Sequence, residues 1–243
     1  MEGNTHFFTV FAKVPERLKP LEDLAYNLWF AWNTEAVELF QRVDPRLWDE
    51  TRHNPVLLLS RSSPERLAAL EKDDAFLGSM DRVYENFKRY QERPYFNNNR
   101  QIRPHSPIAY FSAEYGLTDC LPFFHGGLGV LAADHLKSAS DLNLPLVGVG
   151  LLYQFGAFRQ ILSVEGEQQE VPREIDCYHM PMRLEKDPDG TPHTVQVEYG
   201  DEKAVAQIWR VDVGRVPLYL LDTNIPQNPP HIRQITSRLY AEE

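Results

Sequence analysis

The sequence predicts an α/β fold in which an N-terminal helical region precedes a βαβ unit with an antiparallel β excursion. Between residues 16 and 93, apolar residues recur at three- and four-residue spacing, which is typical of amphipathic helices. From 108 to 152, an apolar run, a glycine-opened helical segment and a second apolar run follow one another, which is the order of a βαβ unit with parallel strands. After residue 157 the pattern changes to alternating strands.

Within the helical region, three helix starts are marked by a capping side chain placed before a proline. These pairs are Asp44-Pro45, Asn54-Pro55 and Ser63-Pro64, and the φ of proline suits a first helical turn. Ser62 with Glu65 also fits a capping box. The apolar faces of the first and last helices are expected to hold Leu18, Leu21, Leu24 or Ala25, Leu28 and Trp32, and then Phe76, Leu77, Met80, Val83, Tyr84, Phe87 and Tyr90.

Trp29, Trp32 and Trp48 are also candidates for stacking on a sugar ring. Aromatic residues at helical spacing belong far more often to a core, so we expect these three to be structural.

A polar, proline-rich segment at 94–106 is expected to link the helical region, 1–93, to an α/β region, 107–243. The run Ile108–Phe111 predicts a buried strand. A helix is expected from about Leu128 to Leu142, and a second buried strand from Pro145 to Leu152.

The remaining elements are expected to be antiparallel strands and one helix. The strands are expected at 157–164 and 167–171, joined by a Glu165-Gly166 turn, and then at 194–199, 203–213 and 216–221. From 232 to 240, Ile232, Ile235 and Leu239 predict one face of a helix that is cut short at Glu243.

Charge and composition exclude several classes of function. A net charge of −10 argues against binding nucleic acid or an anionic membrane surface, both of which need a basic face. Cys120 and Cys177 are too few for a disulfide framework and are typical of a reducing, cytoplasmic location. No apolar stretch reaches the roughly 18 residues of a membrane span, and the N-terminus lacks a signal-peptide pattern.

The candidate binding site is the glycine cluster that opens the helix, Gly126, Gly127, Leu128 and Gly129. Glycines at a helix N-terminus let a ligand approach free N–H groups, and the helix dipole favours an anion there. The spacing also fits a G-x-G-x-x-A dinucleotide fingerprint, but more than ten residues separate these glycines from the first strand, so this match is weak. Glycines that only permit tight packing remain an open alternative.

Glu114 follows the first strand, at the edge of the sheet where ligands of α/β proteins gather. It is either an acceptor for sugar hydroxyls or a buried carboxylate bonded to backbone N–H groups, and the sequence leaves both open. A solvated, salt-bridged helix face accounts for Asp134, Lys137 and Asp141. We expect no metal site, because no histidine pair has metal-ligand spacing with a third ligand nearby, and Cys177-Tyr178-His179 alone is too little.

Three segments, taken in order, resemble the N-terminal domain of α-glucan (glycogen/maltodextrin) phosphorylases, and the short bacterial and archaeal branch most of all. They are the segments 109–116 (AYFSAEYG), 126–142 (GGLGVLAADHLKSASDL) and 146–153 (LVGVGLLY). Residues 10–93 resemble the helical N-terminal region of that branch, and Leu218–Asn224 also fits.

The resemblance implies that residues 107–243 are the first part of a Rossmann-like domain in a GT-B fold of two such domains, truncated here. It implies a glycosyltransferase that uses inorganic phosphate to release glucose 1-phosphate from α-1,4-glucans, with pyridoxal 5′-phosphate as cofactor. It places Gly126, Gly127, Leu128 and Gly129 at the substrate's phosphate or glucosyl unit, and Glu114 near the same pocket. The partners implied are the missing C-terminal domain and a further copy in a homo-oligomer.

Two departures limit this implication. The lysine that binds the cofactor, and the basic residues that hold both phosphates, belong to the C-terminal domain of such enzymes, and nothing in this chain matches them. No catalytic residue is therefore expected in this chain, and the fragment alone is expected to be inactive. His125 and Ala133 also stand where relatives commonly carry other small or polar residues.

Two alternatives remain. A glycogen or starch synthase of GT-B architecture also has a GGLG loop, but it carries a lysine two residues before the glycines, where this chain has Phe124. The other alternative is a non-catalytic glucan-binding module.

Overall fold

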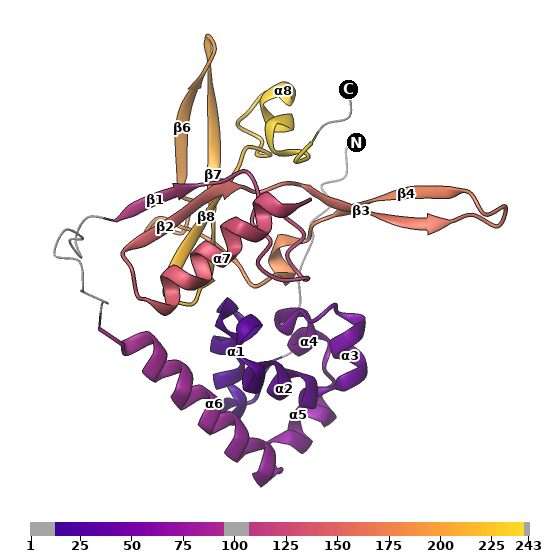
Figure 1. Cartoon of the computed structure of the whole chain (residues 1–243), viewed down its shortest axis with the longest axis vertical. Helices are drawn as coiled ribbons and strands as arrows, with labels where there is room; N and C mark the ends of the chain where they lie inside the picture. The colour runs from indigo at the N-terminus through magenta and orange to yellow at the C-terminus, as the bar shows by residue number, and fades with distance from the viewer. Residues whose placement is uncertain (1–12, 95–106, 241–243) are drawn as a thin grey trace.

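The structure is a computed structural model that describes residues 13–94 and 107–240, and it places a helical region beside a mixed sheet (Figure 1). The helical region contains η1 (Glu16–Leu18), α1 (Pro20–Ala25), η2 (Leu28–Trp32), α2 (Thr34–Val43), α3 (Pro45–Glu50), α4 (Pro55–Arg61), α5 (Pro64–Leu70) and α6 (Asp74–Glu92). The remaining elements are β1 (Ile108–Phe111), α7 (Gly127–Asp141), β2 (Leu146–Leu151), β3 (Phe155–Leu162), β4 (Gln168–Glu174), η3 (Cys177–His179), β5 (Arg183–Leu184), β6 (Thr194–Tyr199), β7 (Glu202–Val213), β8 (Val216–Asp222), α8 (Pro230–Arg233) and η4 (Gln234–Thr236).

The helix starts predicted at three prolines are confirmed. The side-chain oxygens of Asp44, Asn54 and Ser63 each accept a hydrogen bond from the backbone N–H three residues on, at 2.9, 3.0 and 3.1 Å. The capping box expected at Ser62 and Glu65 is wrong. Ser62 Oγ instead donates to the Leu58 carbonyl at 2.8 Å, and its neighbour Ser63 is the cap.

The first apolar face is confirmed as core, but it does not lie on one continuous helix. Leu18, Leu21, Leu24 and Leu28 are fully buried, yet they are divided among η1, α1 and η2. The interruption before η2 has a local cause, because Asn27 leaves helical geometry and its side chain accepts the N–H of Trp29.

The tryptophans behave largely as the sequence predicts. Trp29 and Trp48 are almost fully buried, whereas Trp32 is half-buried. On the last helix, α6, the buried residues are Phe76, Met80, Val83, Phe87 and Tyr90, which confirms its predicted inner stripe.

The expected βαβ unit is confirmed, since β1 pairs with β2 in parallel and α7 connects them. The predicted antiparallel strands are not separate from this unit, however. β8 pairs in parallel with β2 and antiparallel with β7, so the main sheet is mixed, in the order β1-β2-β8-β7-β5, with β6 on β7. Helix α7 packs against β2, β7 and β8.

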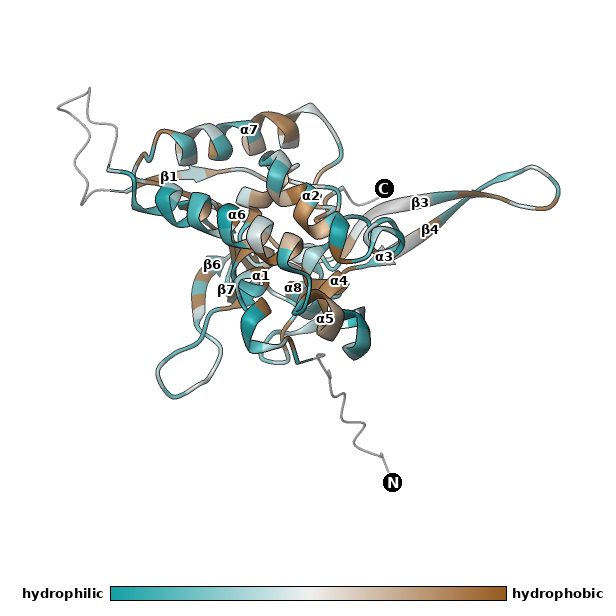
Figure 2. Cartoon of the chain, turned by 90° about the horizontal axis from the view of Figure 1, so that it is seen from below, coloured by the Kyte–Doolittle hydropathy of each residue, from teal (hydrophilic) through white to brown (hydrophobic). Residues whose placement is uncertain are grey.

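One hairpin does stand apart from the main sheet. β3 and β4 form their own two-stranded sheet, and the predicted turn is confirmed at Gly166, which has a φ of +82°. The hairpin projects away from the rest of the molecule in both views (Figures 1 and 2).

The expectation that Ile108–Phe111 is a buried strand is wrong in one respect. The strand is present, but it lies at the edge of the main sheet, so Ile108 is 49% and Phe111 73% exposed. The second strand, β2, has neighbours on both sides, and its side chains alternate between buried and half-buried.

The helix expected from 232 to 240 is also wrong. Ile232 is fully buried in α8, but the helix ends at Arg233 and only the 3-10 turn η4 follows. The carbonyls of Thr236 and Ser237 accept the N–H groups of Gln154 and Phe155 at 2.9 and 3.0 Å, so this backbone bonds to the start of β3 rather than within a helix.

Buried polar groups join the helical region to the α/β region. The Asn27 side chain exchanges two hydrogen bonds with the backbone of Gly214, at 2.9 and 3.0 Å, in the turn between β7 and β8. Tyr90 Oη lies 2.6 Å from Ser140 Oγ, which also accepts the N–H of Arg215 at 2.8 Å. These contacts fix the position of α7, and therefore of its glycine-rich start, relative to the N-terminal helices.

The polar residues of α7 form only part of the solvated, salt-bridged face expected for them. Asp141 accepts hydrogen bonds from Tyr90 Oη at 2.9 Å and from Trp32 Nε1 at 3.3 Å. The Lys137 ammonium lies 5.9 Å from the centre of the Trp32 ring, and burial lowers the pKa of this lysine. Asp134 and Asp141 remain exposed, whereas Lys137 is half-buried against the helical region.

Figure 2 shows hydrophilic and hydrophobic residues along the length of α7. Within residues 13–94 and 107–240, no helix is both long and apolar enough to cross a membrane.

Candidate active site

The glycine-rich start of α7 lies beyond the C-terminal end of β1. In α/β proteins, ligands bind at this edge of the parallel strands. The loop between β1 and α7 folds back on itself. The Tyr115 N–H donates to the Phe123 carbonyl at 3.1 Å, and the Gly116 N–H donates to the Gly129 carbonyl at 2.9 Å. The loop therefore fixes the first turn of α7.

Glu114 is buried directly beneath this turn, with 2% of its surface exposed. Its Oε2 accepts the backbone N–H groups of His125 at 3.0 Å and Gly126 at 3.2 Å. Its Oε1 accepts the hydroxyl of Tyr240 at 2.6 Å. Of the two interpretations of Glu114, this geometry is that of a carboxylate bonded to backbone N–H groups.

The electrostatics of Glu114 follow from these bonds. Burial raises the pKa of a carboxylic acid, but the Tyr240 hydroxyl and the two N–H groups stabilise the ionised form more strongly. The pKa of Glu114 is consequently below its usual value, so the group is a carboxylate at neutral pH.

The three glycines of the cluster fall into two kinds. A Cβ added to Gly129 would lie 2.5 Å from Phe124 Cβ and 3.0 Å from Glu114 Oε2, so this glycine is required for packing. A Cβ added to Gly126 or Gly127 would meet nothing within 4 Å. Packing therefore explains Gly129 but leaves Gly126 and Gly127 unexplained.

The N–H groups at the start of α7 are available to a ligand. Gly127, Leu128 and Gly129 are the first three helical residues, so the helix offers no carbonyl to their N–H groups. The N-cap residue is Gly126, which has no side chain to cap them, and no acidic residue lies in the first turn. His125, Gly126, Gly127 and Leu128 are exposed, whereas Gly129 is buried. This arrangement can bind an anion or a polarised oxygen.

Tyr240 is a residue of this site that the sequence did not indicate. It bonds to Glu114 across 126 positions of sequence, and its ring meets that of His125 edge to face at 5.7 Å. No motif surrounds it, so no local sequence signal could have identified it.

Lys137 is the lysine carried by the glycine-opened helix, and its ammonium lies over Trp32 in contact with the helical region. In residues 13–94 and 107–240, no three His, Cys, Asp or Glu side chains are grouped to hold a metal ion.

Comparison with known proteins divides the chain into two matches. A family described as "Protein of unknown function (DUF3417)" matches residues 14–121, and the family "Carbohydrate phosphorylase" matches residues 123–218. The glycine cluster lies in the second match, and Glu114 lies in the first.

Curated relatives match nearly the whole chain. A glycogen phosphorylase of Mycobacterium tuberculosis is 44% identical over 241 residues, and a maltodextrin phosphorylase of Thermococcus litoralis is 42% identical over 234 residues; each alignment covers 96% of this chain and 28% of the relative. A glycogen phosphorylase of Aquifex aeolicus is 40% identical over 223 residues, covering 92% of this chain and 32% of the relative.

These matches show that the chain is similar to carbohydrate phosphorylases. More narrowly, the chain corresponds to the N-terminal part of the α-glucan phosphorylases of the glycogen and maltodextrin type, which confirms the resemblance seen in its motifs. The chain spans less than a third of the length of these relatives.

Proposed function

We propose that this chain supplies one wall of the active site of an α-glucan phosphorylase, which uses inorganic phosphate to release glucose 1-phosphate from α-1,4-glucans. The observation that carries the proposal is the start of α7, where free N–H groups adjoin two glycines that packing does not explain. In this reading, the N–H groups of Gly127, Leu128 and Gly129 bind the substrate's phosphate or glucosyl oxygens.

Glu114 is a positioning residue in this proposal. Its carboxylate turns the His125 and Gly126 N–H groups inward, and it thereby fixes the direction in which the next three N–H groups point. Preorganised donors of this kind stabilise developing negative charge without reorganising during the reaction.

The finer architecture also belongs to the proposal. We assign residues 107–243 to the first part of one Rossmann-like domain of a GT-B enzyme, with 1–93 as a helical region and 94–106 as a linker. The pyridoxal phosphate lysine and the residues that hold both phosphates are assigned to a C-terminal domain outside this chain. When bound, the cofactor would supply a phosphate group for acid–base chemistry.

The test uses the full-length protein that carries this chain. We expect glucose 1-phosphate to form from maltoheptaose and inorganic phosphate, and maltodextrin to lengthen when glucose 1-phosphate is supplied. If lengthening required a sugar nucleotide in place of glucose 1-phosphate, the protein would be a synthase and the proposal wrong. The absence of any reaction with either donor would favour a glucan-binding module.

A further inference from the structure

Tyr240 reaches the candidate active site from a segment far along the chain. Its hydroxyl donates to Glu114 Oε1 at 2.6 Å, and within the described part of the chain it is the one side chain that donates to this carboxylate. The ring of Tyr240 is 61% exposed. An exposed ring contributes little to a hydrophobic core, so what Tyr240 offers at this position is its hydroxyl.

The segment that carries Tyr240 is fixed in place just before it. Thr236 is fully buried, and its Oγ1 accepts the N–H of Thr223 at 3.1 Å. Two residues further on, Arg238 forms a parallel bridge with Phe155 at the start of β3. These contacts tie the segment to the end of β8 and to β3, so the hydroxyl of Tyr240 is delivered from a defined position.

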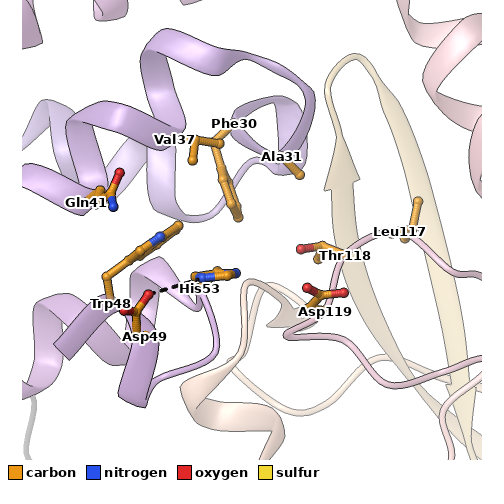
Figure 3. A pocket seen from close by; sticks show the side chains of 10 residues that line it. All are labelled: Phe30, Ala31, Val37, Gln41, Trp48, Asp49, His53, Leu117, Thr118 and Asp119. Atoms are coloured by element: carbon orange, nitrogen blue, oxygen red, sulfur yellow. Dashed lines mark ion pairs between the residues drawn. The ribbon is translucent and has the colours of Figure 1, made fainter. Parts of the chain in front are cut away.

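The loop that carries Glu114 depends on bonds at its ends. In the middle of the loop, Thr118 and Asp119 line a cavity of about 410 Å³, and Figure 3 shows His53 of the helical region across that space. The helical region therefore does not pack closely on the loop at these two residues. Contact with the first turn of α7 is made by Glu114, whose Oε2 accepts the Gly126 N–H at 3.2 Å.

The hydroxyl of Tyr240 favours the charged form of Glu114. Burial raises the pKa of this carboxyl, and of the groups that lower it the Tyr240 hydroxyl acts most strongly, ahead of the N–H groups of His125 and Gly126. Positive charge on His125 lowers the pKa of Glu114 as well. The bond to Glu114 raises the pKa of Tyr240, and burial raises the pKa of Tyr153 to about 12, so both hydroxyls stay protonated.

We propose that Tyr240 is a positioning residue for phosphorolysis, whose hydroxyl fixes the Glu114 carboxylate beneath the first turn of α7. This inference rests on the function proposed above. A carboxylate holds the N–H groups of His125 and Gly126 more firmly than a neutral carboxyl does, because bonds to a charged acceptor are about twice as strong. Loss of the charge would release the turn, and the next N–H groups would no longer be preorganised toward the substrate.

The test removes only the hydroxyl, with Tyr240→Phe in the full-length protein. Without the hydroxyl the pKa of Glu114 rises, so part of the protein carries a neutral carboxyl at mildly acidic pH. Relative to the wild type, we expect kcat/KM for phosphate to fall about tenfold at about pH 5.5 and less than about threefold at about pH 8. The control Tyr199→Phe removes an exposed hydroxyl on β6 and should match the wild type at both pH values.

The melting temperature supplies a second readout that needs no turnover. The depressed native pKa of Glu114 stabilises the wild type above the ordinary pKa of the carboxyl, and this stabilisation is lost as pH falls. Tyr240→Phe should therefore melt earlier than the wild type at neutral pH, and the difference in melting temperature should shrink as pH falls through the raised pKa of the variant. This trend is opposite to that of the activity. In a Glu114→Gln background no carboxyl titrates at this position, so the effects of Tyr240→Phe should not change with pH.

The outcomes separate this inference from the proposed function. A loss of kcat/KM in Tyr240→Phe that is equal at acidic and neutral pH would overturn the inference, since Tyr240 would then support the turn without acting on the charge of Glu114. Kinetics and melting like those of the wild type at every pH would overturn it as well. A difference in melting temperature that shrinks at acidic pH, in a protein without phosphorolysis, would support the action of Tyr240 on Glu114 and refute the proposed function.

Discussion

The contrast between Gly127 and Gly129 offers the sharpest test of the candidate active site. A Cβ at position 127 meets no atom of the chain, so Gly127→Ala should leave the free energy of unfolding within about 1 kcal/mol of the wild type. The same Cβ would stand where a ligand approaches the first N–H of α7. Losing one preorganised donor typically costs roughly 10²-fold, so kcat/KM for phosphate and for glucose 1-phosphate should fall by about that factor.

Gly129→Ala should instead lower the stability of the protein. Its Cβ would lie 2.5 Å from Phe124 Cβ, a separation that real Cβ atoms do not adopt, so the loop or the helix must shift. Overpacking of this kind typically costs about 1–3 kcal/mol, which should appear as a lower melting temperature. Gly78, exposed on α6 with nothing within 4 Å, is the matched control: Gly78→Ala should gain about 0.5–1 kcal/mol and leave the kinetics unchanged.

The assay is steady-state phosphorolysis and thermal unfolding of the three variants of the full-length protein, measured on the same preparations. The reasoning is refuted if Gly127→Ala melts early yet keeps a normal kcat/KM. That result would mean that the loop glycines serve packing alone, and the anion site would have to lie elsewhere.

Three further predictions address the groups around this site. Glu114→Gln should lower the melting temperature at pH 7, and its difference in melting temperature from the wild type should shrink as pH falls through the depressed pKa of the native carboxylate. The exposed control Glu165→Gln should melt at the same temperature as the wild type. A difference for Glu114→Gln that does not change with pH would contradict this prediction. Asn27→Ala should cost about 1–3 kcal/mol in urea unfolding, because it leaves the buried N–H of Gly214 without its acceptor, and a cost near zero would exclude that role. Borohydride reduction of the cofactor-loaded enzyme should label no lysine of residues 1–243, Lys137 included, and a labelled peptide from this chain would disprove the assignment.

Local signals predicted the helix starts because their physics is local. Asp44, Asn54 and Ser63 each bond to a backbone group three residues away, so both partners of each bond lie within one helical turn of the sequence. The positions of the strands along the chain were likewise visible, since alternation of polar and apolar residues is a property of each strand alone. The pairing of β8 with β2 was not visible, because it joins residues about 70 positions apart.

The features that were missed depend on the surroundings of a residue. Phe111 is apolar like a core residue, but its strand lies at the sheet edge, and an edge position cannot be read from four residues. Lys137 has the pattern of a solvated helix face, yet Trp32 from another region covers it. At the candidate site, the glycine cluster and Glu114 were found from sequence, whereas the hydroxyl of Tyr240 that completes the contacts of Glu114 was not.

The turn at Gly214 bears on how the protein can be cut for experiments. Its φ is +63°, and a Cβ there would lie 2.2 Å from Ser140 Oγ and 2.9 Å from Tyr90 Oη, so three segments meet with no spare volume. Deleting the residues before 107 would expose this seam and remove the bonding partners that Asn27 and Tyr90 supply. A shortened version that begins at β1 would thus lack part of its interior, and a truncated protein meant to isolate the glycine cluster should retain the N-terminal helices.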